Sequence, residues 1–448
     1  MSTSWDTSSL RLVATVAAAF VLAARCGGEQ LHAGRWSGAV VYRGASTPAV
    51  LDFRPEAGGT GVRVSLPDLS VFDVPAHRGI TKTNGLELEI EHPVHLRFGG
   101  AFDGSDLTGT VTTSSGASAA VRLHRTGAPP ELRIREEQVR IANGSRILGG
   151  TLIVPTAPGP HPAVVMLHGS HGPDREDLRA PAMLLARAGL TVLIYDKRDI
   201  GKDQKAPHLY AFEDLAADGL AAVRFLRARP EIDPLRVGLW GISEGGWVAP
   251  MIAAADPAIS FVIVVSAPGV TYGELLEHFL RTRMSRRGAA TVQRAEALAT
   301  LRDLFAYVRG QGDAGLVRRS TAAAARERWA AEFGVALRLP TADEVRTEVQ
   351  WRDLDVDPSA YWLQVRVPVL AVWGERDDHP VSESVRRIRT ALEKAGNRDV
   401  TLRVFPAADH ELVVSEALKT WQWPRLASGF VRLLLDWTAS RAKTSLPH

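Results

Sequence analysis

The 448-residue sequence contains a single cysteine, Cys26, and has almost no excess of charge of either sign, with 53 Lys and Arg against 50 Asp and Glu. One cysteine excludes a disulfide within the chain and a zinc site built on cysteines. The near-neutral charge argues against a nucleic-acid binder, which needs a broad basic face. A composition of 45% hydrophobic and 23% charged residues is that of a globular protein. A chain of this length predicts two domains.

Long hydrophobic runs are also lacking, apart from residues 12–24. This run is too short to span a bilayer, which takes about 20 residues, and its alanine-rich character is typical of a signal peptide. The sequence therefore predicts a signal peptide over residues 1–26 and a secreted, periplasmic or cell-envelope protein. Cys26 follows the run as the lipidated cysteine of a bacterial lipoprotein does, but Arg25 stands where such a signal has a small residue. Attachment to the envelope through a lipidated N-terminus is the alternative.

Residues 30–126 consist of short runs of alternating polar and apolar residues, separated by Gly, Pro, Asp and Asn. No stretch there has a helical period. This pattern predicts a small all-β domain, either a barrel or a sandwich. The segment Thr126–Pro130 is expected to be the linker that follows it.

Residues 131–441 alternate between β-rich and helical runs, which predicts a doubly wound, mostly parallel α/β sheet. The expected strands are 133–141, 146–154, 162–167, 190–195, 235–240, 260–266, 367–373 and 400–405, and the expected helices are 177–188, 211–228, 244–255, 383–395 and 424–440. The interval from about 270 to 362 is helical without an obvious strand, which predicts a helical cap inserted into the sheet. Within it, one helical face is expected to carry Val292, Ala295, Leu298, Leu301, Leu304, Phe305 and Val308.

The strongest local motif is Gly-Ile-Ser-Glu-Gly-Gly at 241–246, between an expected strand and an expected helix. A turn this sharp strains the central residue, Ser243, and requires glycine two residues before and after it. Ser243 would then project over the sheet edge at a helix N-terminus, where developing negative charge is stabilised. The motif predicts a nucleophilic serine.

A serine hydroxyl needs a base, and in this architecture an acid and a histidine follow on loops after later strands. His410 is the predicted base, and the acid is expected in the loop Gly-Glu-Arg-Asp-Asp-His-Pro-Val at 374–381. His379 would be the base only with an unusual loop order. One oxyanion donor is expected to be the N–H of Glu244, and the second that of Ser170 or Gly169, in a loop that the side chain of His168 supports.

Together, the segments HGS, YDKRDIGK, GLWGISEGGWVAP, GERDDHPV and ADHE resemble the α/β-hydrolase superfamily, in its bacterial serine esterase and acyl-peptidase-like branch. The resemblance implies a triad of Ser243, Asp377 and His410, oxyanion donors at Ser170 and Glu244, and neither a metal nor an organic cofactor. It also selects Asp377 over Asp378, and in an extended loop only one of these two neighbours can be buried. Two departures are His171, which interrupts the HGSGP pattern, and Asp199, which replaces the glycine of DKRG.

The expected function is the hydrolysis of small-molecule carboxylic esters with small to medium acyl chains, through an acyl-enzyme intermediate. The alternatives are a serine aminopeptidase or acyl-peptidase-type hydrolase, and a thioesterase. An aminopeptidase would use a cap carboxylate to hold the substrate amine, with candidates at Glu274, Glu277, Glu296 and Glu332. A non-catalytic binding protein is the rival of another class, but it would be expected to have lost a triad member. The segment Asp196-Lys197-Arg198 is expected to form ion pairs under the rim of the site. The cap aromatics Trp329, Trp351, Tyr361 and Trp362 would serve as core or as the lining of an acyl pocket.

Overall fold

The computed structural model describes residues 32–42, 44–56, 59–67, 71–79, 85–90, 95–113, 116–131, 133–170, 174–198, 210–327, 339–414 and 425–442. The predicted signal peptide and Cys26 lie outside these ranges. In the described part of the chain, no helix is both long and apolar enough to cross a membrane. The chain divides into two compact units between Leu132 and Arg133. We expect residues 30–126 to fold apart from the second unit, because their strand pattern is self-contained and a linker follows them.

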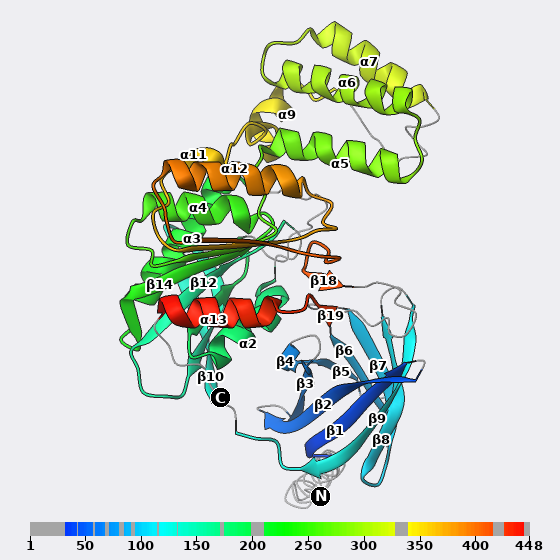
Figure 1. Ribbon diagram of the computed structural model, residues 1–448, viewed down its shortest axis with the longest axis vertical. Helices are drawn as coiled ribbons and strands as arrows, with labels where there is room; N and C mark the ends of the chain where they lie inside the picture. The colour runs from blue at the N-terminus through cyan, green and yellow to red at the C-terminus, as the bar shows by residue number, and fades with distance from the viewer. Residues whose placement is uncertain are drawn as a thin grey trace, which may run out of the picture. The chain divides into compact units, whose positions relative to one another are not determined.

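The first unit is a single antiparallel sheet of nine strands in the order β4-β3-β2-β1-β9-β8-β7-β6-β5. In Figure 1 these strands are coloured from blue to cyan and curl around a common interior. One continuous curled sheet corresponds to the barrel-like alternative of the prediction and not to a two-sheet sandwich. The strands are β1 (Gly34–Tyr42), β2 (Ala45–Glu56), β3 (Gly59–Leu66), β4 (Val71–Pro75), β5 (His77–Gly79), β6 (Gly85–Ile90), β7 (Leu96–Asp103), β8 (Asp106–Thr113) and β9 (Ser118–Gly127).

The core of this sheet forms around Trp36, which is fully buried. Its ring packs edge-on against Phe102, with ring centroids 5.1 Å apart, and Phe53 completes the aromatic group. Two residues along β1, a Cβ at Gly38 would lie 2.1 Å from the carbonyl oxygen of Arg122 on β9. Glycine is therefore required there for the two strands to pair.

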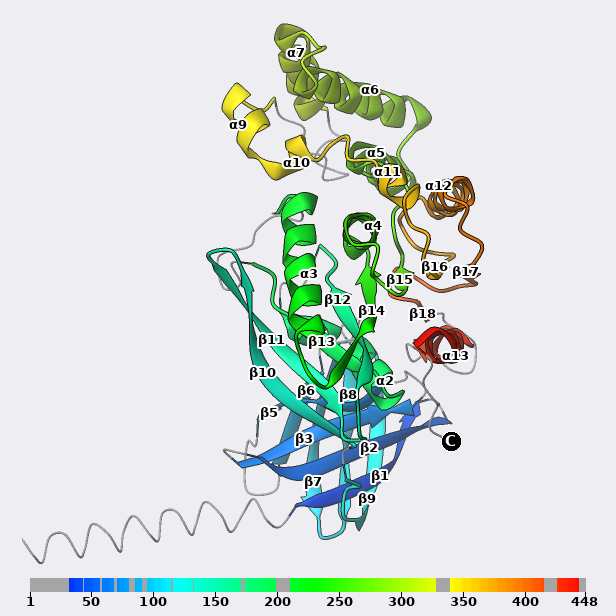
Figure 2. The same ribbon diagram turned by 90° about the vertical axis from the view of Figure 1, so that its left-hand side faces the viewer.

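The second unit contains an eight-stranded sheet in the order β10-β11-β13-β12-β14-β15-β16-β17. Strand β11 pairs antiparallel with both of its neighbours, and all pairs from β13 to β17 are parallel. The predicted α/β-hydrolase fold class is confirmed, and all eight expected strands are present (Figure 2). The strands are β10 (Ile134–Asn143), β11 (Arg146–Pro155), β12 (His161–Leu167), β13 (Thr191–Tyr195), β14 (Ile232–Ile242), β15 (Val262–Val265), β16 (Val369–Gly374) and β17 (Val400–Phe405).

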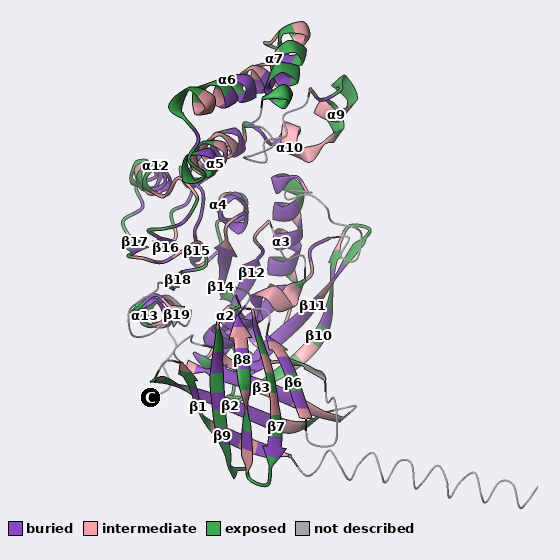
Figure 3. Ribbon diagram, turned by 90° about the vertical axis from the view of Figure 1, so that its right-hand side faces the viewer, coloured by how far each residue is buried: buried purple, intermediate pink, exposed green. Residues whose placement is uncertain are grey.

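Helices cover both faces of this sheet, as its crossover connections require. In Figure 1, α3, α4 and α12 lie above the strands, and α2 and α13 lie below them. The central strands are buried along their whole length because they are covered on both sides (Figure 3). The covering helices are α2 (Arg179–Arg187), preceded by the 3-10 turn η2 (Arg175–Leu178), α3 (Phe212–Arg227), α4 (Gly245–Ala255), α12 (Val381–Lys394) and α13 (Phe430–Ala442).

The last predicted helix, 424–440, was placed too early. Residues Arg425–Leu426 form a short strand, β19, which pairs antiparallel with β18 (Val413–Val414). Gly429 follows with a φ of +80°, and helix α13 begins only at the next residue, Phe430. The left-handed glycine ends the extended segment before the helix can start.

The predicted helical insertion is present between β15 and β16. Its helices are α5 (Tyr272–Arg286), α6 (Thr291–Val308), α7 (Ala314–Arg326), α9 (Ala342–Thr347), α10 (Val349–Arg352) and α11 (Ser359–Trp362). Two small apolar clusters hold α5, α6 and α7 together, and Leu304 and Phe305 of α6 lie in one of them. The buried face of α6 differs from the prediction at its start, since Val292 and Ala295 are exposed. Both precede the part of α6 that packs into these clusters.

Candidate active site

Ser243 occupies the turn between β14, which ends at Ile242, and α4, which begins at Gly245. Its φ of +54° lies in the left-handed region, which a residue with a side chain rarely adopts. The Ser243 N–H donates to the carbonyl of Val265, 2.9 Å away, and this bond ties the turn to the end of β15. A strained residue held by its surroundings at the carboxyl edge of a parallel sheet is a typical feature of an active site.

The glycines around Ser243 have no room for a side chain. A Cβ at Gly241 would lie 2.5 Å from the carbonyl oxygen of Gly245, and one at Gly245 would lie 2.8 Å from that of Leu167. A Cβ at Gly246 would lie 2.4 Å from the Cβ of Ala267. These contacts confirm the expectation that the turn requires glycine on both sides of the serine.

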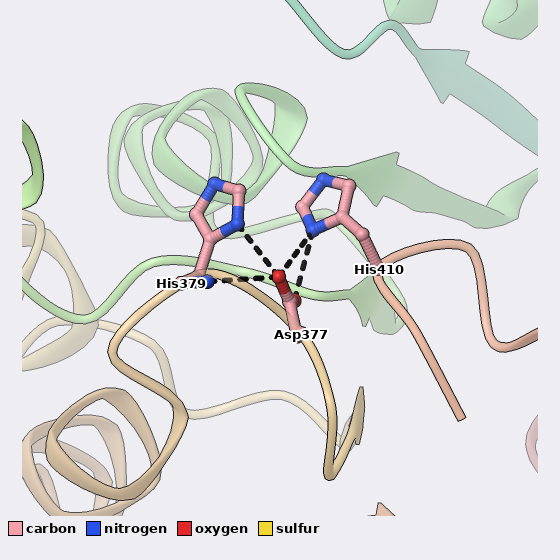
Figure 4. A group of neighbouring side chains, drawn as sticks. All are labelled: Asp377, His379 and His410. Atoms are coloured by element: carbon pink, nitrogen blue, oxygen red, sulfur yellow. Dashed lines mark hydrogen bonds and ion pairs between the residues drawn. The ribbon is translucent and has the colours of Figure 1, made fainter. Parts of the chain in front are cut away.

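Asp377 and His410 come from the loops after β16 and β17 and meet beyond the strand ends (Figure 4). His410 Nδ1 lies 2.8 Å from Asp377 Oδ2 and 2.9 Å from Oδ1. The Asp377 side chain is fully buried, whereas that of His410 is 31% exposed. The loops can approach because Gly374 ends β16: a Cβ there would lie 2.0 Å from the carbonyl oxygen of Asp409.

The Asp377 carboxylate is kept ionised. Burial alone would raise its pKa, but the hydrogen bonds from His379 and His410 outweigh burial and hold the pKa well below its usual range. The negative charge of Asp377 next to His410 Nδ1 favours the imidazole tautomer that carries its proton on Nδ1. The Nε2 of His410 is then left as a proton acceptor.

The serine turn and the histidine loop are anchored to consecutive residues at the end of β15. Val265 accepts the Ser243 N–H, and the hydroxyl of Ser266 donates to the carbonyl of His410 at 2.7 Å. Ser266 is fully buried and also has a left-handed φ, +52°. The two loops are therefore held side by side. Sequence reasoning missed Ser266, although its place at a strand end in the same sheet was a usable signal.

A second histidine shares the Asp377 carboxylate. His379 Nδ1 and its backbone N–H both lie within 2.9 Å of Asp377 Oδ1. Its ring stacks on that of His410, with centroids 4.1 Å apart and planes 12° from parallel, and Phe279 of α5 packs edge-on against it. Burial lowers the pKa of His379 and so favours the neutral ring. The hydrogen bond to Asp377 acts in the opposite direction but is the smaller effect. The sequence had suggested a role for His379 only in the case of an unusual loop order, and not as a second partner of Asp377.

The donor atoms of Asp377, His379 and His410 lie within 4.8 Å of one another, as in a metal site. The two imidazoles are nearly parallel, however, so their Nδ1 atoms point side by side at the carboxylate (Figure 4). A metal ion at about 2.0 Å from both nitrogens would lie outside at least one ring plane. The arrangement suits two N–H groups sharing one carboxylate better than it suits a tetrahedral ion.

Asp378 behaves differently from its neighbour Asp377. Its side chain is 56% exposed and forms an ion pair with Arg286 at the end of α5. The two adjacent carboxylates thus face opposite ways. Only Asp377 is bonded to His410.

The predicted oxyanion loop lies against the serine. A Cβ at Gly169 would be 3.5 Å from the Ser243 Cβ. His168, directly before it, is buried and donates from Nε2 to the carbonyl of Tyr195, which fixes the start of the loop. The departures at His171 and Asp199 lie outside the described residues, as do Trp329 and Glu332.

Each residue of the segment Asp196-Lys197-Arg198 anchors a different element. Asp196 binds Arg175 at 2.8 Å, Lys197 binds Glu244 at 2.5 Å, and Arg198 binds Asp218 of α3 at 2.7 Å. These ion pairs agree with the structural role expected for the segment.

We expect His410 and not His379 to act as the base, because His410 is the more exposed of the two and lies on the loop anchored next to the serine turn. His410→Gln should lower kcat on p-nitrophenyl acetate by about 10³-fold or more. His379→Gln should lower kcat by less than about tenfold, because the glutamine amide can still donate to Asp377. A larger loss in His379→Gln than in His410→Gln would make His379 the base.

His168 gives the fold a defined response to acid. Burial, with the positive charge of Lys197 as the next cause, lowers the pKa of His168 from 6.5 to about 4. Between these two pH values the unfolded chain binds a proton that the folded chain does not, so the free energy of unfolding falls as the pH falls through this window. At pH 5 the loss from this residue is about 2 kcal/mol. His168→Phe should remove this part of the pH dependence, as measured by urea unfolding at pH 7.5 and 5.0. Equal losses in both proteins would contradict the assignment.

Comparison with known proteins identifies a family model that matches the hydrolase unit, and relatives that are named as hydrolases of esters and thioesters. Residues 158–417, more than half of the chain, match the family model described as serine aminopeptidase, S33. Esterase EstD of Thermotoga maritima is 25% identical over 334 residues, which cover 71% of this chain and 72% of that protein. Acyl-coenzyme A thioesterase 1 of Homo sapiens is 32% identical over 161 residues, which cover 35% of this chain and 34% of that protein.

Among solved structures, that of 2,6-dihydroxy-pseudo-oxynicotine hydrolase is similar at 21% identity and a TM-score of 0.41, covering 62% of this chain and 63% of that one. The chain spans only 34–41% of the length of several curated relatives that it matches. The family match, the sheet order and the serine turn lead to one conclusion: the chain belongs to the S33 serine aminopeptidase family of the α/β-hydrolase superfamily.

Proposed function

We propose that the protein hydrolyses carboxylic esters with small to medium acyl chains, using Ser243 as nucleophile, His410 as base and Asp377 as acid. The observation that carries the proposal is the hydrogen bond between the buried Asp377 carboxylate and His410 Nδ1, at 2.8 Å. It leaves Nε2 of His410 available as a base, on a loop that is anchored to Ser266, next to the residue that holds the strained serine turn. The proposal places a small-molecule ester in the site and needs neither a metal nor an organic cofactor.

In the first half of the reaction, Ser243 Oγ attacks the ester carbonyl and His410 Nε2 takes the hydroxyl proton. Asp377 stabilises the resulting imidazolium. The N–H groups of Glu244 and Ser170 donate to the carbonyl oxygen as it becomes negative. The imidazolium then returns the proton to the leaving alcohol, and the acyl group stays on Ser243.

In the second half, His410 takes a proton from water, whose oxygen attacks the acyl-enzyme. The tetrahedral intermediate uses the same two N–H donors. When it collapses, the proton returns to Ser243 Oγ and the carboxylic acid leaves. The enzyme ends in its starting state.

The cap carboxylates that are described favour an ester over an aminopeptidase substrate. Glu274 is engaged by both terminal nitrogens of Arg387, each at 2.7 Å, and Glu277 is paired with Arg302 at 2.8 Å. A carboxylate already neutralised by an arginine is a poor site for a substrate ammonium group. Glu296 is exposed to solvent, where an ion pair with an amine would add little.

The cap aromatics support a structural role in preference to an acyl pocket. Trp362 is fully buried in the main core of the hydrolase unit, and Tyr361 packs against the same core. Trp351 packs against the apolar cluster that joins α6 to α7 and donates from its indole to Glu348 at 2.9 Å. The preferred acyl-chain length is therefore tested with a series of esters of increasing chain length.

Thioester hydrolysis is the second candidate, since the same triad performs it and one relative is named a thioesterase. The greater length of the match to an esterase, 71% of this chain against 35%, favours the ester. The hydrophobic run at residues 12–24 also supports export, so we propose an extracytoplasmic ester substrate.

A panel of p-nitrophenyl acetate, butyrate and hexanoate, aminoacyl p-nitroanilides and acyl-coenzyme A tests the proposal. We expect turnover of the esters, with a loss in kcat of about 10⁴-fold or more in Ser243→Ala. Ser285→Ala, at an exposed position of α5, is the matched control and should retain full activity. Cleavage of anilides without cleavage of esters would contradict the ester assignment. Undiminished turnover in Ser243→Ala would contradict the mechanism.

A further inference from the structure

Lys197 contacts both loops that flank the serine. Its ammonium group donates to the carbonyl oxygen of Gly169 and to Oε1 of Glu244, each at 2.5 Å. The Lys197 side chain is only 6% exposed and that of Glu244 only 3%. A buried lysine is costly unless its charge is paired, so its presence here calls for a specific role.

The bond to Gly169 fixes the direction of the next N–H. Among the described residues, only the Gly159-Pro160 peptide is cis, so the Gly169–Ser170 peptide is trans and planar. In a trans peptide the C=O and the N–H point in opposite directions. Because the Gly169 carbonyl points at Lys197, the Ser170 N–H points away from Lys197.

This peptide lies beside the nucleophile, since a Cβ at Gly169 would be 3.5 Å from the Ser243 Cβ. Glycine has wide backbone freedom, and a rotated peptide would present its carbonyl oxygen where the N–H is needed. An oxygen there would repel the oxyanion instead of stabilising it. The short bond from the charged lysine opposes that rotation.

We propose that Lys197 is a positioning residue of the oxyanion hole, which holds the Gly169 carbonyl so that the Ser170 N–H faces the reacting carbonyl oxygen. Its second bond, to Glu244, ties the residue that follows the nucleophile to the same ammonium group. One buried cation thereby contacts both residues whose N–H groups are the proposed donors or lie next to them. This inference rests on the proposed function, because the oxyanion hole belongs to that reaction.

A purely structural role predicts something different. In that case Lys197 would only neutralise the buried Glu244 carboxylate. A variant that lacks both charges, K197M/E244Q, would then be at least as active as E244Q. Comparing K197M/E244Q with E244Q separates the two roles, because neither protein has a charged Glu244 and only E244Q keeps the bond to Gly169.

We expect kcat on the best ester to be about 10²-fold lower in K197M/E244Q than in E244Q, with KM changed by less than about threefold. The affinity for a trifluoromethyl ketone, which forms a tetrahedral oxyanion on the serine, should fall in parallel with kcat. Loss of packing alone would not produce this parallel loss. The matched control is R198M/D218N, which removes the neighbouring buried ion pair. It should lower Tm and keep kcat within about threefold.

Equal kcat and equal ketone affinity in K197M/E244Q and E244Q would overturn the proposal. If K197M/E244Q does not fold, K197L/E244Q carries the same comparison, because leucine also has neither a charge nor a hydrogen-bond donor. The proposed function is tested separately, by ester turnover in the wild type and its loss in Ser243→Ala. A wild type active on esters with unaffected Lys197 variants would overturn only the positioning role.

Discussion

Ser243 keeps its left-handed backbone because the chain around it leaves no alternative. Gly241, Gly245 and Gly246 let β14, α4 and the neighbouring strand ends approach to distances that no Cβ would allow. The Ser243 N–H is hydrogen-bonded to the end of β15, and this bond and the surrounding packing offset the backbone strain at Ser243. Every other part of the site is arranged around the position that this turn gives to the hydroxyl.

The remaining parts reach the serine from the carboxyl ends of neighbouring strands. Ser266 at the end of β15 holds the His410 loop, and the Asp377 loop after β16 supplies the carboxylate. On the other side, β12 leads into Gly169 and β13 leads into Lys197. The parallel sheet thus brings the carboxyl ends of six strands, β12 to β17, to one edge, where the site forms. Figure 2 shows these strands side by side in the hydrolase sheet.

The sequence allowed the sheet and the serine turn to be predicted because their signals are local. Each central strand is a short apolar run, and the turn is a six-residue motif. The partners of Ser266 and Lys197 were not identified from the sequence, because they lie far from these residues in the chain. Lys197 and Glu244 are 47 residues apart, and Ser266 and His410 are 144 apart. Helix α13 was placed too early because the short β19 pairing competes with helical propensity only in the folded chain.

The central claim is that Ser243 carries the acyl group during turnover. The most direct measurement is peptide mass spectrometry of the protein quenched in acid during reaction with p-nitrophenyl acetate. The account predicts an acetyl group on the peptide that contains Ser243 and none on that peptide in Ser243→Ala. An acetyl group on another residue that is removed at the rate of turnover would contradict the account.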